Sequence, residues 1–484
     1  MISFIIAIVL LVLGYLFYSK FVEKVIGVDP KRPTPATTMA DGVDYVPMKP
    51  WRIYLIQFLN IAGIGPICGA IMGAQFGTAS FLWIVFGSIF AGAVHDFVAG
   101  FISLRDKGCS LPSIHGRYLG PKTRGFLSGL TIVLMILVGA VFVNTPAVLI
   151  NANFTPDWSI FVWVAVIFAY YIIATLLPID KVIGRIYPIF GVLLLGMAVA
   201  LLVAFVVYRP AMPEVWDGLQ NAHPDAAHNP IFPMMFISIA CGAISGFHAT
   251  QSPLMARCMV NEKQARPIFY GAMITEGIVA LIWAAAATYF YHDPVLAAES
   301  AGKAGPAMVG LIANTWFPPV VAVITILGVI AAAVTSGDTA LRSARLIVAE
   351  MIHVDQKPVS RRLLVAVPVF VVTGAVLVYS LADANGFAVI WRYFAWLNQL
   401  LAAVTLWAIV FYLVEHKKSY WFALIPALFM TMVTGCFLFV AEKEGFGSFI
   451  PHWLGYTIGA LLTIFQVIYF YSWKKKNRNR TIEE

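Results

Sequence analysis

The stretch Phe232-Pro-Met-Met-Phe-Ile-Ser-Ile-Ala-Cys-Gly-Ala-Ile-Ser-Gly-Phe-His-Ala-Thr-Gln-Ser-Pro253 is apolar at its ends, but its middle holds glycine, hydroxyls, a histidine and a glutamine. Gly242 and Gly246 weaken a helix, because glycine loses the most backbone freedom on ordering. In hydrocarbon, loosened backbone survives only where protein or a wet cavity satisfies its polar groups. The stretch therefore predicts a broken helix that lines a solute site. The alternative is a kinked helix packed through small residues.

A second interrupted stretch occurs in the first half of the chain. Ile61-Ala-Gly-Ile-Gly-Pro-Ile-Cys-Gly-Ala-Ile-Met-Gly73 is also apolar, and Gly63 and Gly65 interrupt it. Two broken spans at corresponding places in two halves are the best sequence indication of a transporter binding site. We therefore expect the two broken helices to meet near the centre of a bilayer.

Bulk composition excludes a soluble globular domain. Of 484 residues, 60% are hydrophobic and 12% are charged, whereas soluble domains carry about 25% charged residues. Windows of about 20 apolar residues recur along the whole chain, which indicates an all-α polytopic membrane protein. The net charge of +8 lies in the loops between these windows and does not indicate a nucleic-acid partner. The five cysteines lack Cys-x-x-Cys spacing, so neither a zinc site nor a disulfide framework is expected.

The apolar windows predict about 13 transmembrane helices. They lie at 1–18, 53–76, 80–104, 126–150, 160–177, 186–208, 231–255, 268–291, 318–347, 363–381, 387–413, 420–441 and 453–473. We expect the following organisation: an extra N-terminal helix (1–19), a cytoplasmic connector (20–52), a first five-helix repeat (53–208), an external loop (209–230), a second five-helix repeat (231–414), two C-terminal helices (415–473) and a basic cytoplasmic tail (474–484).

The distribution of basic residues supports this topology. With the N-terminus outside, 28 of the 32 Lys and Arg fall in loops on the cytoplasmic side. The exceptions are Arg209, Lys303, Arg392 and Lys443. The first basic residue, Lys20, follows the first apolar run, so we expect a retained helix, with a cleaved signal as the alternative.

An odd number of helices in each repeat makes the second repeat run inverted to the first. Two inverted five-helix repeats, each opening with a broken helix, are typical of the leucine-transporter-like arrangement. In that arrangement the third helix of repeat two carries hydroxyl ligands for sodium. Thr335 and Ser336 fall in this helix, so they are the candidate sodium ligands here.

Ionisable groups inside apolar spans are functional candidates, because each costs roughly 2.5–3.5 kcal/mol to insert. The candidates for ion or proton coupling are the ionisable residues His95, Asp96, Glu276 and Asp338, together with the hydroxyl-bearing Thr335 and Ser336. A histidine beside an aspartate can relay a proton, and a structural polar contact between helices is the alternative. Gly337 is expected to loosen a turn that presents the Thr335–Asp338 oxygens, or else this turn caps the end of the span.

The substrate site is predicted at the two breaks. Half-helix N-termini and loosened amides favour a carboxylate, and nearby polar side chains would complete the site. The candidate substrate-binding residues are Gly63, Gly65, Gly242, Ser245, Gly246, His248, Gln251, Asn398 and Gln399. A structural role is the alternative for each polar side chain.

The sequence contains no phosphate-binding loop, no His-Glu-x-x-His and no Gly-x-Ser-x-Gly, so neither ATP-driven transport nor enzymatic activity is expected. One alternative is a membrane-embedded hydrolase that uses Ser245 or Ser252 with His248. Another is a nutrient sensor that binds solute without moving it.

Several motifs carry a family resemblance. They are Asp41-Gly-x-Asp-Tyr-x-Pro47, Ile61-Ala-Gly-x-Gly-Pro66, Phe86-Gly-x-x-Phe-Ala-Gly-Ala-Val-His-Asp-Phe97, Arg105-x-x-Gly-x-Ser-Leu111 and Ile239-Ala-Cys-Gly-Ala-Ile-Ser-Gly-Phe-His248. With these motifs the chain resembles the carbon starvation protein A (CstA) family of inner-membrane transporters. Two features depart from the longer members. Those members carry a His-His pair where this chain has Ile56-Gln57, and they extend well beyond 484 residues.

The resemblance implies a secondary transporter, linked to the carbon-starvation response, that imports peptides or small carboxylates such as pyruvate. Symport with a proton or a sodium ion is expected, and sodium is the sole candidate cofactor. The expected partners are the small-molecule substrate and the lipid bilayer of the inner membrane, with the C-terminus cytoplasmic. The sequence does not specify an oligomeric state.

Overall fold

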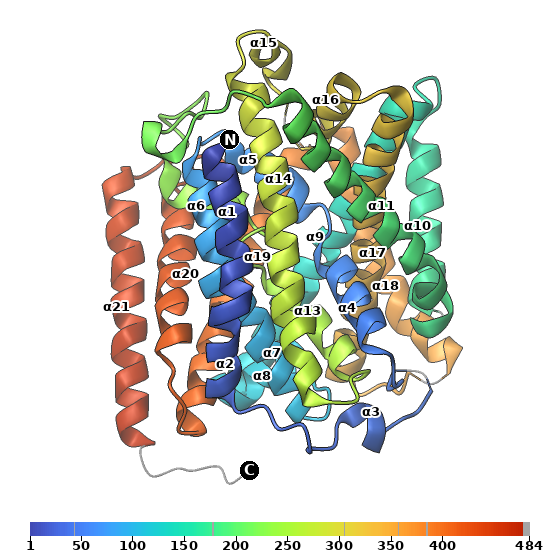
Figure 1. Ribbon diagram of the computed structural model, residues 1–484. Helices are drawn as coiled ribbons and strands as arrows, with labels where there is room; N and C mark the ends of the chain where they lie inside the picture. The colour runs from blue at the N-terminus through green and yellow to red at the C-terminus, as the bar shows by residue number, and fades with distance from the viewer. Residues whose placement is uncertain (43, 177–178, 304, 357, 384–385, 478–484) are drawn as a thin grey trace.

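The computed structural model is a bundle of helices that run across the molecule (Figure 1). The structure describes residues 1–42, 44–176, 179–303, 305–356, 358–383 and 386–477, and only the backbone at 179–186 and 388. Within these ranges there is no β-strand. Three predicted features lie outside the described residues. They are the end of one predicted span at Leu177, one of the basic residues counted on the cytoplasmic side, Lys357, and the part of the tail from 478 to 484.

Ten helices of the described chain are long and apolar enough to cross a membrane. Some of these spans combine a π-helical turn with the α-helices beside it. They are α1–η1–α2 (Ile2–Ile26), α6–η3–α7 (Ala79–Arg105), α9 (Pro121–Phe154), α11 (Ile179–Tyr208), η7–α14 (Arg266–His292), α17 (Pro319–Met351), α18 (Val359–Ala382), α19 (Gly386–Glu415), α20 (Trp421–Val440) and α21 (His452–Lys476).

The other three predicted spans contain helices that are shorter or interrupted, and they are not among these ten. α4 (Pro50–Ile61) and the following η2–α5 (Gly65–Ala74) are bent by 52° at a break. α10 (Ile160–Leu176) is a shorter apolar helix. The span predicted at 231–255 consists of η5–α12 (Ile231–Ser238) and α13 (Gly246–Ala256), which are separated by residues without helical structure. All thirteen predicted segments therefore contain helix in the described structure, and two of them are interrupted.

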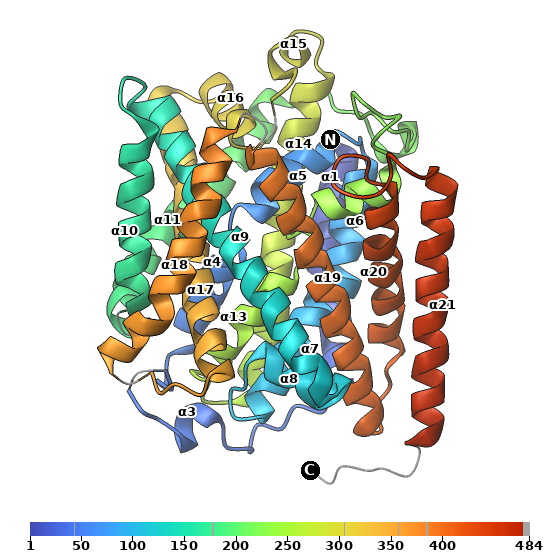
Figure 2. The ribbon, with the colours of Figure 1, turned by 180° about the vertical axis from the view of Figure 1, so that it is seen from behind.

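Short helices cap the two faces of the bundle. α15 (Leu296–Ser300) and α16 (Pro306–Trp316) lie on the same face as the N-terminus, whereas α3 (Pro35–Thr38) and α8 (Leu111–Leu119) lie on the opposite face (Figures 1 and 2). The helix α21 ends on that second face. The face that carries Met1 is the predicted outer face.

Helices differ in how much protein surrounds them. In the spans that contain α7 and α14, 83% of the residues in the apolar window are buried within the bundle. In α21 this share is only 17%. Exposed apolar side chains such as Val192, Val371 and Phe465 cover the outer helices. Because apolar side chains face hydrocarbon while helices satisfy their own backbone groups, this surface suits a lipid environment.

The two breaks pack directly against each other. A Cβ added at Gly65 would lie 2.3 Å from the Cys241 sulfur, and one added at Gly69 would lie 2.8 Å from the Ser238 carbonyl oxygen. Gly242 likewise approaches the Cα of Pro66, at 3.6 Å from the position of its own added Cβ. Glycine is required here because no larger residue leaves room for the neighbouring chain. The predicted meeting of the two broken segments is therefore confirmed.

Candidate functional site

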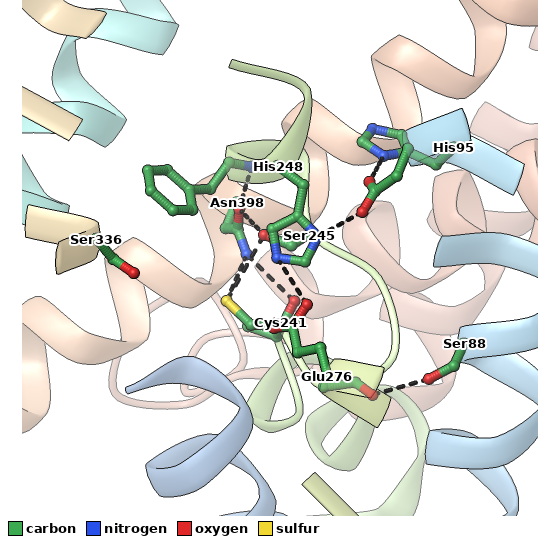
Figure 3. Close-up of polar contacts among 12 residues, drawn as sticks. Ser88, His95, Cys241, Ser245, His248, Glu276, Ser336 and Asn398 are labelled. Carbon is green, nitrogen blue, oxygen red and sulfur yellow. Dashed lines mark hydrogen bonds and ion pairs between the residues drawn. The ribbon is translucent and has the colours of Figure 1, made fainter. Parts of the chain in front are cut away.

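A chain of four ionisable side chains lies beside the second break (Figure 3). The Nδ1 atoms of His95 and His248 each lie 2.8 Å from a different carboxylate oxygen of Asp96. The other ring nitrogen of His248, Nε2, lies 3.3 Å from Glu276 Oε2. All four side chains are fully buried. The helices α7, α13 and α14 thus bring together four of the predicted residues.

The second break, Ile239–Ser245, is held by two side-chain amides from α19. Asn398 Oδ1 accepts hydrogen bonds from the Ser245 hydroxyl at 3.0 Å and from the Phe247 amide at 2.8 Å. Its Nδ2 donates to the Ala240 carbonyl at 3.2 Å. Gln399 Nε2 donates to the Phe236, Ile239 and Ala240 carbonyls. Asn398 and Gln399, which were predicted as substrate-binding residues, therefore contact the unwound backbone.

Four successive backbone amides of this break, those of 242–245, lie in a buried segment. Among the described residues, no group accepts a hydrogen bond from the backbone amides of 242–245. The Gly242 carbonyl, by contrast, accepts a hydrogen bond from the Ser88 hydroxyl at 3.0 Å. Successive unpaired amides at the N-terminus of a half-helix form a site that favours an anion.

The first break, Ala62–Ile64, is satisfied by hydroxyl groups. The hydroxyls of Thr335 and Ser336 each donate to the carbonyl oxygen of Leu59, at 3.1 Å. A Cβ added at Gly63 would lie 2.8 Å from the Ser336 hydroxyl, so α17 passes close to the break. Hydroxyl and carbonyl oxygens are the ligands that sodium uses at broken helices. The residues present therefore fit the predicted ion.

Asp338 lies on the same helix but in a different setting. Its carboxylate accepts hydrogen bonds from the hydroxyls of Tyr170 at 2.9 Å and Tyr187 at 3.0 Å. The turn that Gly337 was predicted to loosen is absent, because α17 continues without interruption to Met351. Gly337 instead makes room for Tyr171, whose hydroxyl lies 2.2 Å from the position of an added Cβ.

The remaining predicted polar residues bond within the protein. Gln251 Nε2 donates to the hydroxyls of Thr250 and Ser343, and its Oε1 is buried without a partner. The Ser252 hydroxyl donates to the His248 backbone carbonyl at 3.1 Å. In the described structure no serine hydroxyl is hydrogen bonded to the His248 ring, whose nitrogens face carboxylates.

Sequence reasoning missed several buried polar groups. Tyr170 and Tyr187 escaped notice because tyrosine is common in apolar spans, although their hydroxyls hold Asp338. Gln57 is fully buried and neither of its amide atoms has a hydrogen-bond partner. A glutamine inside an apolar run was the signal that could have identified it, and it stands where the longer relatives were expected to differ.

Two interrupted helices that meet inside a bundle of apolar helices define a multi-pass membrane protein with a fold of the leucine-transporter type. The fold is shared with MhsT solved in complex with L-phenylalanine, at a TM-score of 0.55 and 13% identity, covering 85% of this chain and 99% of that one. It is also shared with a Na⁺-coupled sialic acid symporter, at a TM-score of 0.53 and 15% identity, covering 96% and 95%.

The chain belongs to the family described as carbon starvation protein CstA, whose family model matches residues 1–162, 153–314 and 295–436. A Haemophilus influenzae protein described as an uncharacterized membrane protein is 43% identical over 359 residues, which cover 64% of this chain and 96% of that protein. The family resemblance inferred from the motifs is therefore confirmed.

Relatives with transporter names are longer. The Campylobacter jejuni "Peptide transporter CstA" is 31% identical, with 57% of this chain and 48% of that protein covered. The Escherichia coli "Pyruvate/proton symporter BtsT" is 29% identical, with 57% of this chain and 47% of that protein covered. The chain thus spans about half the length of these two relatives.

Proposed function

We propose that this protein is a secondary active transporter of the inner membrane that imports peptides or small carboxylates such as pyruvate by cation symport. A role in the response to carbon starvation would follow from its family. The names of two relatives support the substrate classes. The observation that carries the proposal is the buried chain of ionisable groups beside the second break.

The geometry of this chain suits a proton. A neutral imidazole has one donor and one acceptor nitrogen, so His248 that donates from Nδ1 to Asp96 keeps Nε2 as an acceptor facing Glu276. A proton that moves between Glu276 and Nε2 changes the charge of both groups while the Asp96 contact stays in place. Because all of them are fully buried, the charge state of the cluster has a large energetic effect on the adjacent helix.

Substrate binding would use the other side of the same break. The free amides of 242–245 would bind the carboxylate of the substrate. His248 lies three residues after Ser245, in the first turn of α13. The protonation state of its ring and the conformation of the break are therefore linked through this one turn. Symport requires such a linkage between ion and substrate.

Sodium is the second candidate ion, at Thr335, Ser336 and the Leu59 carbonyl. These residues would hold the ion at the first break, where it would supply positive charge close to the substrate. We favour the proton because the ionisable cluster directly adjoins the amides, whereas the hydroxyls are already hydrogen bonded to the carbonyl they share. The predicted orientation, with the N-terminus outside, remains part of the proposal.

Uptake into proteoliposomes tests the proposal. Pyruvate and dialanine are offered under an imposed pH gradient or an imposed sodium gradient. We expect Glu276→Gln to reduce pH-driven uptake by about tenfold or more, while exchange of labelled for unlabelled substrate without a gradient continues. Glu299→Gln is the matched control, because Glu299 is exposed on α15.

One result would overturn the transport proposal, and another would overturn the assignment of the proton to the cluster. One is that wild-type protein accumulates neither probe under either gradient. The other is that Glu276→Gln and Glu299→Gln behave alike under a pH gradient, which would remove the proton role of the cluster.

A further inference from the structure

A cavity of about 640 Å³ opens near the predicted outer face, away from the ionisable cluster. Its walls come from the loop before η5, the loop before α16, and the ends of α18 and α19 that lie on this face (Figure 2). Pockets of this size accommodate ligands larger than a single small acid. The cavity can therefore hold a whole substrate molecule of either proposed class.

The floor of the cavity consists of the two outer half-helices. Cys68 and Met72 come from η2–α5, just beyond the first break, while Ile237 and Ser238 end η5–α12, just before the second. A ligand in the cavity therefore touches the segments that lead to both breaks. The cavity and the predicted central site are consecutive along one route.

The lining is unusually rich in the basic residues that this face otherwise lacks. Of the four Lys and Arg predicted on the outer side, Lys303 and Arg392 both line this cavity. No described carboxylate forms an ion pair with the Lys303 ammonium. Arg392 forms an ion pair with Glu444, which is almost fully buried and fixes the guanidinium in place. Since a guanidinium has five N–H donors, donors remain for a ligand.

A third donor comes from His223, in the external loop. Its Nδ1 accepts a hydrogen bond from the Asp225 amide at 3.1 Å, which leaves the proton of a neutral ring on Nε2. Burial, together with the nearby Arg392, lowers the pKa of His223, so the ring is neutral at pH 7. The ring packs on Phe76, at a centroid distance of 4.8 Å, at the outer end of α5.

We propose that this cavity is an outer docking site for the carboxylate group of the substrate, with the Lys303 ammonium, the Arg392 guanidinium and the His223 Nε2–H as donors. The inference rests on the proposed transport function and adds a second place where substrate is held. The lining also contains the carboxylate of Asp383, so it offers both signs of charge. A peptide C-terminus and a 2-oxo acid share the recognised chemistry, and the experiment distinguishes them.

Positive charges in a concave site raise the local concentration of an anion, and salt screens this effect. Loss of one such charge should weaken capture more than it slows the later steps. We therefore expect a raised KM with little change in the maximal rate, and a weaker dependence of KM on ionic strength.

The test compares Lys303→Met with Lys443→Met in the full-length protein. Lys443 is an exposed outer lysine that does not line the cavity. Three probes are used: pyruvate, dialanine and dialanine amide, which lacks the carboxylate. Binding to detergent-solubilised protein is measured by calorimetry, and uptake is measured in proteoliposomes. His223→Phe is a second variant that keeps a ring against Phe76 but removes the Nε2 donor.

We expect Lys303→Met to raise the Kd and KM of a carboxylate probe about fivefold, in line with the effect of one peripheral charge, and His223→Phe to raise them less. Lys443→Met should change neither. If Lys303→Met raises the Kd of pyruvate alone, the ligand is a 2-oxo acid. If it raises the Kd of dialanine alone, the ligand is a peptide.

The docking site is overturned if Lys303→Met binds the carboxylate probes like wild type, if it weakens dialanine amide equally, or if wild type binds no probe. Binding without any uptake by wild-type protein would instead overturn the transport function and leave the site standing, so the two failures are distinguishable.

Discussion

The first break leaves three residues outside helices, Ala62–Ile64, and the second leaves seven, Ile239–Ser245. At the first, the carbonyl of Leu59 meets two hydroxyls of α17. At the second, side-chain amides of α19 bind the carbonyls, and the backbone amides of 242–245 stay free. Similar glycine-containing sequences thus produce different chemistry. The first break presents acceptor oxygens, which suit a cation, and the second presents donors, which suit an anion.

The difference also shows which helix stabilises each break. The hydroxyls at the first break come from one helix that has its own continuous backbone hydrogen bonds. The second break depends on Asn398 for contacts at several points along the unwound chain. Four predictions, in decreasing order of expected effect, test whether the two breaks are stabilised separately.

The largest effect is expected from Asn398→Ala. The change leaves the Phe247 amide and the Ser245 hydroxyl without their acceptor in a buried site. Each such loss costs about 1–3 kcal/mol, so we expect the free energy of unfolding to fall by about 4 kcal/mol. Unfolding by sodium dodecyl sulfate measures it. Asn314→Ala, at an exposed asparagine, is the control, and equal losses in the two variants would contradict the role of Asn398.

Adding a methyl group at each break compares their packing. In Gly242→Ala the new Cβ would lie 2.5 Å from the Cβ of Ala280, an atom fixed to the backbone. In Gly63→Ala the nearest atoms, at 2.7–2.8 Å, belong to the side chains of Phe142 and Ser336. We expect losses of about 3 kcal/mol and about 1 kcal/mol respectively, since overpacking costs depend on what can move.

The same unfolding measurement applies to these two variants. Gly129→Ala is the control, because a Cβ there meets no heavy atom within 4 Å. A larger loss at Gly63 than at Gly242 would show that the first break is the more tightly packed one.

Acid should destabilise the helix that holds the second break. His115, on α8, contacts the Thr405 hydroxyl of α19 at 3.1 Å. Burial lowers the pKa of His115 to about 3, with a smaller contribution from His95. The unfolded chain binds the proton at higher pH than the folded one does. Stability is therefore complete above about pH 6.5 and falls by about 1.4 kcal/mol per pH unit between there and about pH 3.

His115→Gln should flatten this slope, as measured by unfolding at pH 7 and pH 5. His353→Gln, at an exposed histidine, should not. If the slope persists in His115→Gln, another group is responsible for the acid sensitivity.

The smallest effect is expected from Thr335→Ala. The hydroxyl of Ser336 still donates to the Leu59 carbonyl in this variant, so that acceptor keeps a partner. We expect a loss of about 1 kcal/mol, and Thr335→Ser should restore most of it. A loss as large as that of Asn398→Ala would remove the contrast between the breaks.

Much of the fold could be predicted because a membrane imposes long apolar segments on the sequence. All thirteen predicted segments contain helix in the described structure, ten helices are long enough to cross a membrane, and both breaks lie where glycine interrupts the apolar runs. The Gly337 turn could not be predicted correctly. Glycine weakens a helix and also allows close packing, and only the position of Tyr171 shows that the second effect applies there.

The site was predictable as a set of residues and not as an arrangement. Each member of the ionisable cluster stood out as a charge inside an apolar span. That Asp96 would contact His248, 152 residues further on, depends on how the helices pack. Asn398 was likewise chosen as a polar residue in an apolar helix, but its contact with the unwound backbone required the three-dimensional structure.

Helix α19 carries Arg392 at the outer cavity, Asn398 at the second break and Thr405 against α8. These residues stand on one continuous helix, Gly386–Glu415, and the first and last are separated by about 20 Å of axial rise. A rigid rod of this kind transmits displacement along its whole length. If the rod tilts when a solute arrives, the displacement reaches α8 on the opposite face, and the unwound segment Ile239–Ser245, which Asn398 contacts, moves with it.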